Sequence, residues 1–172
     1  MIKLVRPTIK YRRSFLVAVK EFQKEGRYKG IESKQLPKRF AGFVRKLKDY
    51  ARGIDLPKEY IPESIYWLVD GDKFIGRVSV RHRLTEKLRK EGGNIGYEIR
   101  PAARRKGYGK KILKLSLPKA LRLGIKKALV TCDDDNIGSR KIIKANGGIL
   151  KEKIKYKGKI VRHYWISIME KE

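Results

Sequence analysis

Residues 97–110 have the residue types and spacing of an anion-binding site. Six basic residues and no acidic one lie within residues 100–111, where a predicted strand gives way to a predicted helix. A helix N-terminus has unpaired backbone N–H groups and a partial positive charge, so it attracts phosphate. Gly107 and Gly109 lack side chains and let the backbone come close to a ligand. The segment therefore predicts a phosphate site made mainly of backbone amides.

Two common phosphate motifs do not fit this stretch. A dinucleotide-binding loop has the pattern Gly-x-Gly-x-x-Gly, but the position of its third glycine is occupied by Ile112. A Walker loop contains Gly-Lys-Ser or Gly-Lys-Thr, and neither tripeptide occurs in the sequence. What remains is the pattern Arg104-x-x-Gly107-x-Gly109.

The elements that must position this loop follow from hydrophobic periodicity and turn signals. The predicted strands cover residues 3–5, 64–69, 74–81, 94–100, 127–132, 151–157 and 160–169. The predicted helices cover residues 10–24, 37–52, 107–123 and 136–145. Strands 64–69 and 74–81 form a hairpin around an Asp-Gly-Asp-Lys turn. Strand 94–100, helix 107–123 and strand 127–132 form a crossover unit with parallel strands.

With these elements in place, the chain resembles the GCN5-related N-acetyltransferase (GNAT) family. The Arg104-x-x-Gly107-x-Gly109 pattern follows a hairpin and an Arg100-Pro101 junction, and a later strand ends before Asn136 and Ser139. The resemblance implies an α+β fold: a mixed, mostly antiparallel sheet of about seven strands flanked by helices. Its fourth and fifth strands would be a splayed parallel pair. We expect residues 1–172 to form a single N-acetyltransferase domain.

The resemblance also implies direct transfer of acetyl from acetyl-CoA to a primary amine, without a covalent enzyme intermediate. The pantetheine arm would lie between the splayed strands, where backbone groups would polarise the thioester carbonyl. Loop amides would hold the pyrophosphate, and Asn136 would reach the cofactor arm. The implied cofactor-binding residues are Tyr97, Ile99, Arg104, Arg105, Lys106, Gly107, Tyr108, Gly109, Lys110, Asn136 and Ser139.

The acid and base are less clear from the sequence. An alkylammonium must lose its proton before it attacks, and Glu98 on the strand beside the thioester is the first candidate for the base. A salt bridge to a nearby cation is the alternative for Glu98. His82 is the second candidate, with a plain surface histidine as its alternative. Many family members place a tyrosine acid seven residues after the asparagine, where this chain has Ile143, so Tyr108, Tyr97 or water would substitute.

The cysteine and histidines give no sign of metal chemistry. We interpret Cys132 as a buried small residue, since no base partner accompanies it. Two histidines and one cysteine, widely spaced, form no metal motif. We therefore expect acetyl-CoA as the cosubstrate and no metal.

The net charge of +27 is the unusual feature of the composition. Such a field attracts polyanions, so we expect a small-molecule or peptide amine acceptor that is itself anionic. The competing function is a catalytically weak module that binds nucleic acid or the ribosome through its basic surface. A general trait of the source proteome would explain the charge equally well.

Location and assembly are only weakly constrained. No apolar run exceeds five residues, so no membrane span is expected, and the N-terminal residues lack the apolar stretch of a signal peptide. A single cysteine favours a reducing, cytoplasmic setting. The sequence is compatible with a monomer or a homodimer.

Overall fold

The computed structural model describes residues 1–169. Its strands are β1 (Ile2–Val5), β2 (Glu63–Asp70), β3 (Lys73–Arg81), β4 (Ile95–Ile99), β5 (Lys127–Asp133), β6 (Ile149–Tyr156) and β7 (Lys159–Ser167). Its helices are α1 (Arg12–Lys24), α2 (Leu36–Tyr50), α3 (Glu86–Lys90), α4 (Tyr108–Leu121) and α5 (Ile137–Lys144). The predicted strands and helices are confirmed within a few residues at their ends. The short helix α3, which Thr85 caps, lies in a segment predicted to be a loop.

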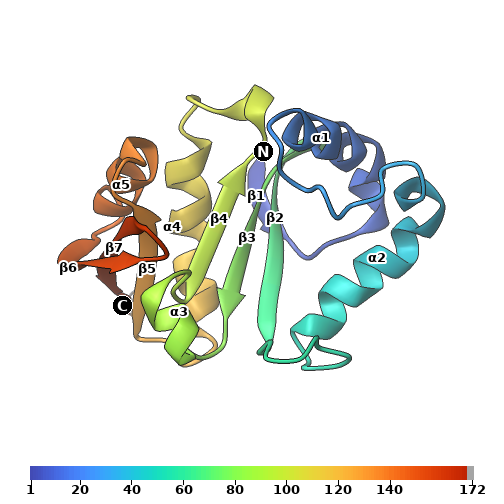
Figure 1. The fold of residues 1–172 in the computed structure, drawn as a ribbon. Coiled ribbons are helices and arrows are strands. Elements are labelled where there is room, and N and C mark those ends of the chain that lie inside the picture. The colour runs from blue at the N-terminus through green and yellow to red at the C-terminus, as the bar shows by residue number, and fades with distance from the viewer. Residues whose placement is uncertain (170–172) are drawn as a thin grey trace.

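The strands form two antiparallel sheets rather than one continuous sheet. One has the order β1-β2-β3-β4 and the other the order β5-β7-β6. Both β4 and β5 run upward in Figure 1, and they diverge towards the top of that view. Residues 1–169 contain no ladder between these two strands. The predicted splay is therefore complete, and it leaves one edge of β4 unpaired.

The two sheets meet where β4 begins. The backbone N–H of Asn94 donates to the Leu129 carbonyl at 2.7 Å, and the Asn94 side-chain oxygen accepts from the Leu129 N–H at 2.9 Å. Gly93 precedes this contact with φ +63°, and a Cβ there would lie 2.3 Å from the Leu129 carbonyl oxygen. Only glycine fits so close to a neighbouring backbone in this conformation. The junction therefore fixes the narrow end of the space between β4 and β5.

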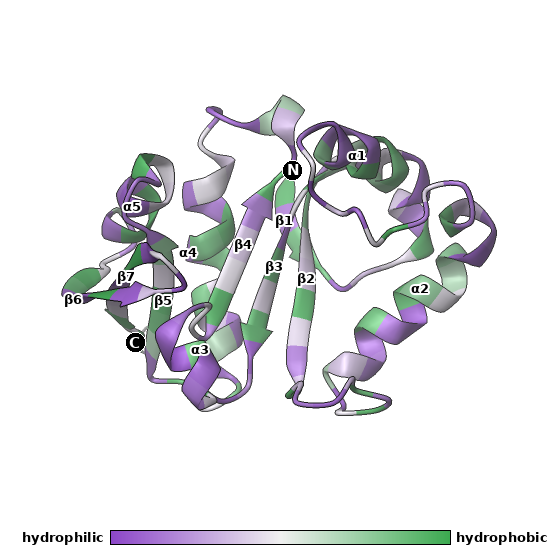
Figure 2. Cartoon of the chain, viewed as in Figure 1, coloured by the Kyte–Doolittle hydropathy of each residue, from purple (hydrophilic) through white to green (hydrophobic). Residues whose placement is uncertain are grey.

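A separate apolar core covers each face of the first sheet. On one face Ile112 of α4 belongs to the same cluster as Leu68 and Val78, and this cluster continues into β5 and β7. On the other face α1 and α2 pack over β2 and β3 through aromatic contacts, including Phe15 stacked on Trp67 with centroids 4.7 Å apart. Figure 2 shows hydrophobic and hydrophilic residues alternating along these two helices. The alternation of β2 residues between the two clusters is the period-two pattern of a strand buried on both faces.

None of the helices within residues 1–169 has the length and apolar character that a membrane crossing requires.

Candidate active site

The predicted phosphate loop connects β4 to the first turn of α4. After a 3₁₀ turn at Pro101–Ala103, Arg105 and Gly107 adopt positive φ values of +60° and +78°. Gly107 caps α4, and no side chain bonds to the first amides of the helix. A Cβ added to Gly107 would meet nothing within 4 Å, so open space lies over the helix N-terminus. This is the arrangement in which exposed amides bind an anion.

The second glycine of the loop has a different role from the one expected. A Cβ at Gly109 would lie 2.4 Å from the Ile142 side chain on α5. Its lack of a side chain therefore allows α4 and α5 to pack closely. The sequence-based reason, close approach of the backbone to a ligand, stays a prediction for Gly107.

The basic side chains of the loop differ in their surroundings. The Arg104 guanidinium binds both carboxylate oxygens of Glu25, at 2.7 and 2.8 Å, and also donates to the Ile99 carbonyl. The Lys106 ammonium donates to the Ala102 carbonyl at 3.3 Å. These two side chains hold the loop in shape. Arg105 and Lys110 are exposed, which leaves them accessible to a phosphate.

The side chains of Tyr97, Cys132 and Ser139 lie close together between β4 and α5. The Tyr97 hydroxyl is buried, and the side chains of Ser139 and Cys132 lie close to it. Burial raises the pKa of Tyr97 to about 12 and that of Cys132 to about 11. The Asn136 side-chain oxygen accepts from the Ser139 N–H at 3.0 Å and so caps α5. Its predicted contact with the cofactor arm stays a prediction.

Glu98 points to the opposite face of β4, towards the segment between α1 and α2. Its carboxylate accepts hydrogen bonds from the Arg27 guanidinium and the Tyr28 hydroxyl. Burial is the main cause that raises the pKa of Tyr28 above its ordinary value. Tyr28 has φ +54°, a conformation uncommon for a bulky residue. The salt bridge that the sequence left open for Glu98 is therefore present.

The other two predicted catalytic residues lie away from Glu98. Nε2 of His82 is 2.9 Å from the Ser64 hydroxyl, and burial lowers its pKa. His82 lies five residues beyond the β3 partner of Glu98, which is about 16 Å along the strand. The Tyr108 hydroxyl donates to Asp70 at 3.1 Å, beside the β2–β3 turn. The structure therefore does not bring these three residues together.

The sequence did not reveal which acidic side chains pair with the arginines of the loop. Glu21 lies on α1 and Glu25 directly follows that helix, and they bind Arg100 and Arg104, which are also four residues apart. Hydrogen bonding from Arg100 is the main cause that lowers the pKa of Glu21. One signal was available in the composition. Acidic residues are scarce in so basic a chain, and each of them has many cations with which it can form an ion pair.

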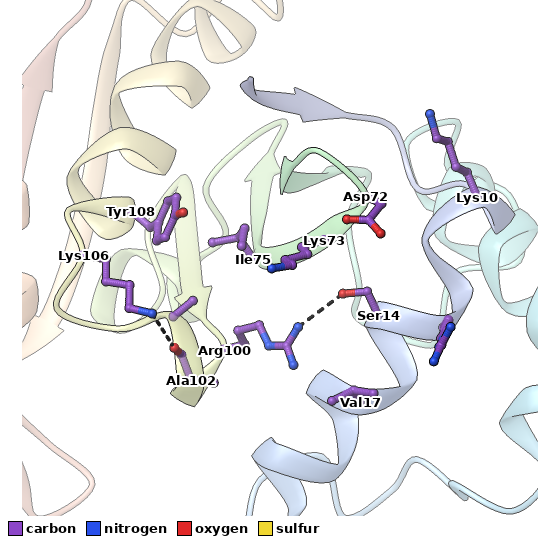
Figure 3. A pocket seen from close by; sticks show the side chains of 12 residues that line it. Lys10, Ser14, Val17, Asp72, Lys73, Ile75, Arg100, Ala102, Lys106 and Tyr108 are labelled. Atoms are coloured by element: carbon purple, nitrogen blue, oxygen red, sulfur yellow. Dashed lines mark hydrogen bonds between the residues drawn. The ribbon is translucent and has the colours of Figure 1, made fainter.

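A basic pocket lies on the α1 side of the loop. It encloses about 660 Å³ between the start of α1, the β2–β3 turn and the loop. Figure 3 shows Lys106 and Tyr108 on one side of it and Ser14 on the other, with Lys73 and Arg100 between them. Residues 1–169 contain no group of three or more His, Cys, Asp or Glu side chains that could hold a metal ion.

A family model for the acetyltransferase (GNAT) domain matches residues 27–149. The chain belongs to the GNAT acetyltransferase family. It is thus an acetyl-CoA-dependent acetyltransferase, as the sequence resemblance implied. No curated protein matches the sequence.

Solved structures confirm the GNAT fold. The acetyltransferase of Salmonella typhimurium that modifies the N-terminal serine of 50S ribosomal subunit protein L7/L12 is 16% identical, with a TM-score of 0.66 over 98% of this chain and 95% of that one. The microcin C7 self-immunity acetyltransferase MccE, solved with acetyl-CoA and AMP, is 16% identical, with a TM-score of 0.66 over 97% and 92%. RimL, a ribosomal L7/L12 alpha-N-protein acetyltransferase solved with a coenzyme A–cysteine disulfide, is 17% identical, with a TM-score of 0.65 over 96% and 94%.

Proposed function

We propose that this GNAT enzyme transfers acetyl from acetyl-CoA directly to a primary amine within a ternary complex. The observation that supports the proposal is the divergence of β4 and β5, which meet at the Asn94 junction, share no ladder and leave one edge of β4 unpaired. A donor held at the loop could extend its arm along the unpaired edge of β4. Extended ligands commonly bind sheet edges through backbone hydrogen bonds.

The loop and the strand edge would supply two different kinds of stabilisation. The amides at the start of α4 would bind the pyrophosphate, helped by Arg105 and Lys110. Backbone N–H groups of β4 near Tyr97 to Ile99 would polarise the thioester carbonyl, where negative charge develops during attack. Because both partners are held in place, positioning would account for much of the rate.

The acceptor would approach from the α1–α2 side of β4. Glu98 faces that side and is the only carboxylate within β4, so it stays our predicted base. The net charge of +27 favours acceptors that carry acidic groups, and we propose an acidic peptide or small-molecule amine. Two of the proteins with similar structures acetylate ribosomal protein L7/L12, which supports a peptide acceptor. The free thiol of Cys132 supports a reducing, cytoplasmic setting.

The first experiment is a test of donor binding with two matched glycine variants. Gly107 precedes α4 and Gly124 follows it, both have φ near +80°, and a Cβ at either would meet nothing within 4 Å. Acetyl-CoA should raise the melting temperature of the wild type and of Gly124→Leu in a saturable way. It should not do so for Gly107→Leu, whose side chain would occupy the phosphate position. A full shift in Gly107→Leu would refute the assigned donor site.

Activity is then tested by thiol release from acetyl-CoA with a panel of amines, acidic peptides and basic peptides. Acidic acceptors should show the larger kcat/KM at low salt, and salt should reduce that advantage because it screens the charge. Release without any dependence on an amine would contradict N-acetyl transfer. If salt does not change the kcat/KM advantage of acidic acceptors, the net charge of the enzyme does not select them.

The basic pocket favours a second candidate function, the binding of nucleic acid or ribosome. Its lining includes five cationic residues, Lys10, Arg13, Lys73, Arg100 and Lys106, against one acidic residue, Asp72. Reversal of three exposed pocket charges (Lys10→Glu, Arg13→Glu, Lys73→Glu) should weaken RNA binding more than the same reversal at Lys144, Lys151 and Lys155. Equal losses in the two triple variants would show that only the diffuse field of the protein acts on RNA.

A further inference from the structure

Charged side chains gather on the acceptor side of β4. This acceptor-side cluster consists of Arg27, Glu63, Arg77, Arg81 and Glu98. Arg77 of β3 is the register partner of Glu98, so the two side chains leave the sheet on the same face. Since Glu98 contacts Arg27 and Tyr28 on that face, Arg77 is directed towards the side from which the acceptor would approach. This assignment of the acceptor side rests on the proposed function.

The second carboxylate of the cluster comes from β2. Glu63 accepts a hydrogen bond from the Ser79 hydroxyl, and guanidinium nitrogens of Arg77 and Arg81 each lie 3.9 Å from its carboxylate oxygens. In a bidentate pair between arginine and a carboxylate these distances are about 2.8 Å. Glu63 therefore forms only a long ionic contact with each arginine and leaves their bidentate capacity unused.

The two strand arginines differ in how they are held. The Arg81 guanidinium donates to the Gly92 carbonyl at 2.9 Å and to the Gly93 carbonyl at 3.2 Å. Arg81 is thus part of the connection between β3 and β4. The Arg77 side chain is 32% exposed, and its guanidinium lies beside the Tyr28 hydroxyl. Arg77 is therefore the strand arginine that a bound acceptor can reach.

The charge balance of the cluster indicates what the acceptor must carry. Three arginines and two glutamates give the cluster a net charge of +1. An acceptor that brings only an ammonium would raise this charge in a partly buried place, where like charges repel strongly. An acceptor that brings both an ammonium and a carboxylate would leave it unchanged. A carboxylate close to the amine therefore offsets the cost of bringing that amine to Glu98.

We propose that Arg77 binds a carboxylate of the acceptor and so determines which amines are acetylated. Its planar guanidinium matches a carboxylate in a bidentate pair. Opposite residues on one face of antiparallel strands have Cβ atoms about 5 Å apart, so the amine at Glu98 and the carboxylate at Arg77 are separated by roughly one or two residue lengths. The acceptor is therefore an amino acid or a peptide whose acidic group lies on its first or second residue.

The test compares two peptide amides of identical composition, one with aspartate as its second residue and one with aspartate as its last residue. Both have the same net charge, so the overall field of the enzyme acts on them almost equally. Wild-type enzyme should show a kcat/KM about 10- to 100-fold larger for the first peptide, as one hydrogen-bonded charge pair predicts. Arg77→Gln should reduce this ratio to near unity. A wild-type ratio near unity, or a wild-type ratio retained in Arg77→Gln, would overturn the proposal.

The matched control is Arg83→Gln, which removes the same charge from an exposed arginine beyond the end of β3. This variant should keep the wild-type ratio. An equal loss of the ratio in both variants would show that net charge rather than direct contact selects the acceptor, and would also overturn the proposal. Arg77→Lys should recover part of the preference, because an ammonium keeps the charge but lacks the bidentate geometry.

Two further readouts separate this inference from the function on which it rests. Acetyl-CoA should raise the melting temperature of Arg77→Gln as much as that of the wild type, which shows that the variant folds and binds the donor. Since Arg77 is the neighbour of Glu98, its loss can lower kcat/KM for both peptides, and only their ratio tests the contact. Absence of amine-dependent thiol release from the wild type with every acceptor would instead refute the proposed function.

Discussion

The ion pair between Arg100 and Glu21 should be among the largest single contributions of a polar contact to stability. The Arg100 side chain is 11% exposed and that of Glu21 is 22% exposed. Arg100 donates to both carboxylate oxygens of Glu21, to the Ser14 hydroxyl at 3.2 Å and to the Phe74 carbonyl at 3.1 Å. In Arg100→Met, all these acceptors lose a donor while the carboxylate stays charged.

The expected cost follows from the burial of the pair. Removal of one partner from a buried ion pair costs about 3 to 5 kcal/mol, and the partial exposure of Glu21 favours about 3 kcal/mol. For a chain of this length that loss corresponds to a melting temperature lower by about 6 to 12 °C. Urea unfolding and calorimetry measure both quantities. The double variant Arg100→Met with Glu21→Met should recover part of the loss, because no buried charge is left unpaired.

The pH dependence gives a second, independent readout. The folded pKa of Glu21 lies below its ordinary value of 4.5, chiefly through the hydrogen bond from Arg100. The unfolded state therefore binds more protons around pH 4, so this contribution is present above pH 4.5 and is lost as the pH falls through the folded pKa. Arg100→Met should lose less stability on acidification than the wild type. A loss below 1 kcal/mol at pH 7, or an unchanged acid response, would refute the reasoning.

Three other outcomes are expected. Asn94→Ala should lower the free energy of unfolding by about 2 kcal/mol in urea titrations, because the buried Leu129 N–H loses its acceptor. An unchanged free energy of unfolding would contradict the role of this hydrogen bond in joining the two sheets. Glu98→Gln should reduce kcat more than acetyl-CoA binding if this carboxylate is the base, and unchanged pH–rate profiles would exclude that role. Cys132 should react with iodoacetamide far more slowly than a free thiol, since a pKa of about 11 leaves about 300-fold less thiolate; a rate equal to that of the unfolded chain would contradict its burial.

Local patterns in the sequence predicted the strands, the four longer helices and the position of the loop, but not the short helix α3. The Asp-Gly turn located the β2–β3 hairpin, and the Gly107 and Gly124 signals set the ends of α4. These features depend on neighbours in the chain. The family resemblance added the splay of β4 and β5, for which periodicity alone gave no sign.

Contacts between distant segments could not be predicted in this way. Arg27 and Tyr28 reach Glu98 across about 70 residues of sequence, and Arg100 meets Glu21 across about 80. In a chain with so many cations, charge alone does not select one partner for a carboxylate. Tyr108 illustrates the same limit, because its place on α4 was predicted while its orientation towards Asp70 depends on how the hairpin packs.

Helix α4 has a mechanical role that follows from the divided sheet. It packs on β1, β3 and β4 of one sheet and on α5, and its core cluster extends to Ala128 and Tyr164 of the other. The two sheets therefore share one packed helix, and the first turn of that helix is the proposed phosphate-binding site. A ligand that binds to this turn should slow the exchange of amide hydrogens in both sheets. Donor binding should therefore stabilise the whole molecule cooperatively rather than only the sheet that carries the site.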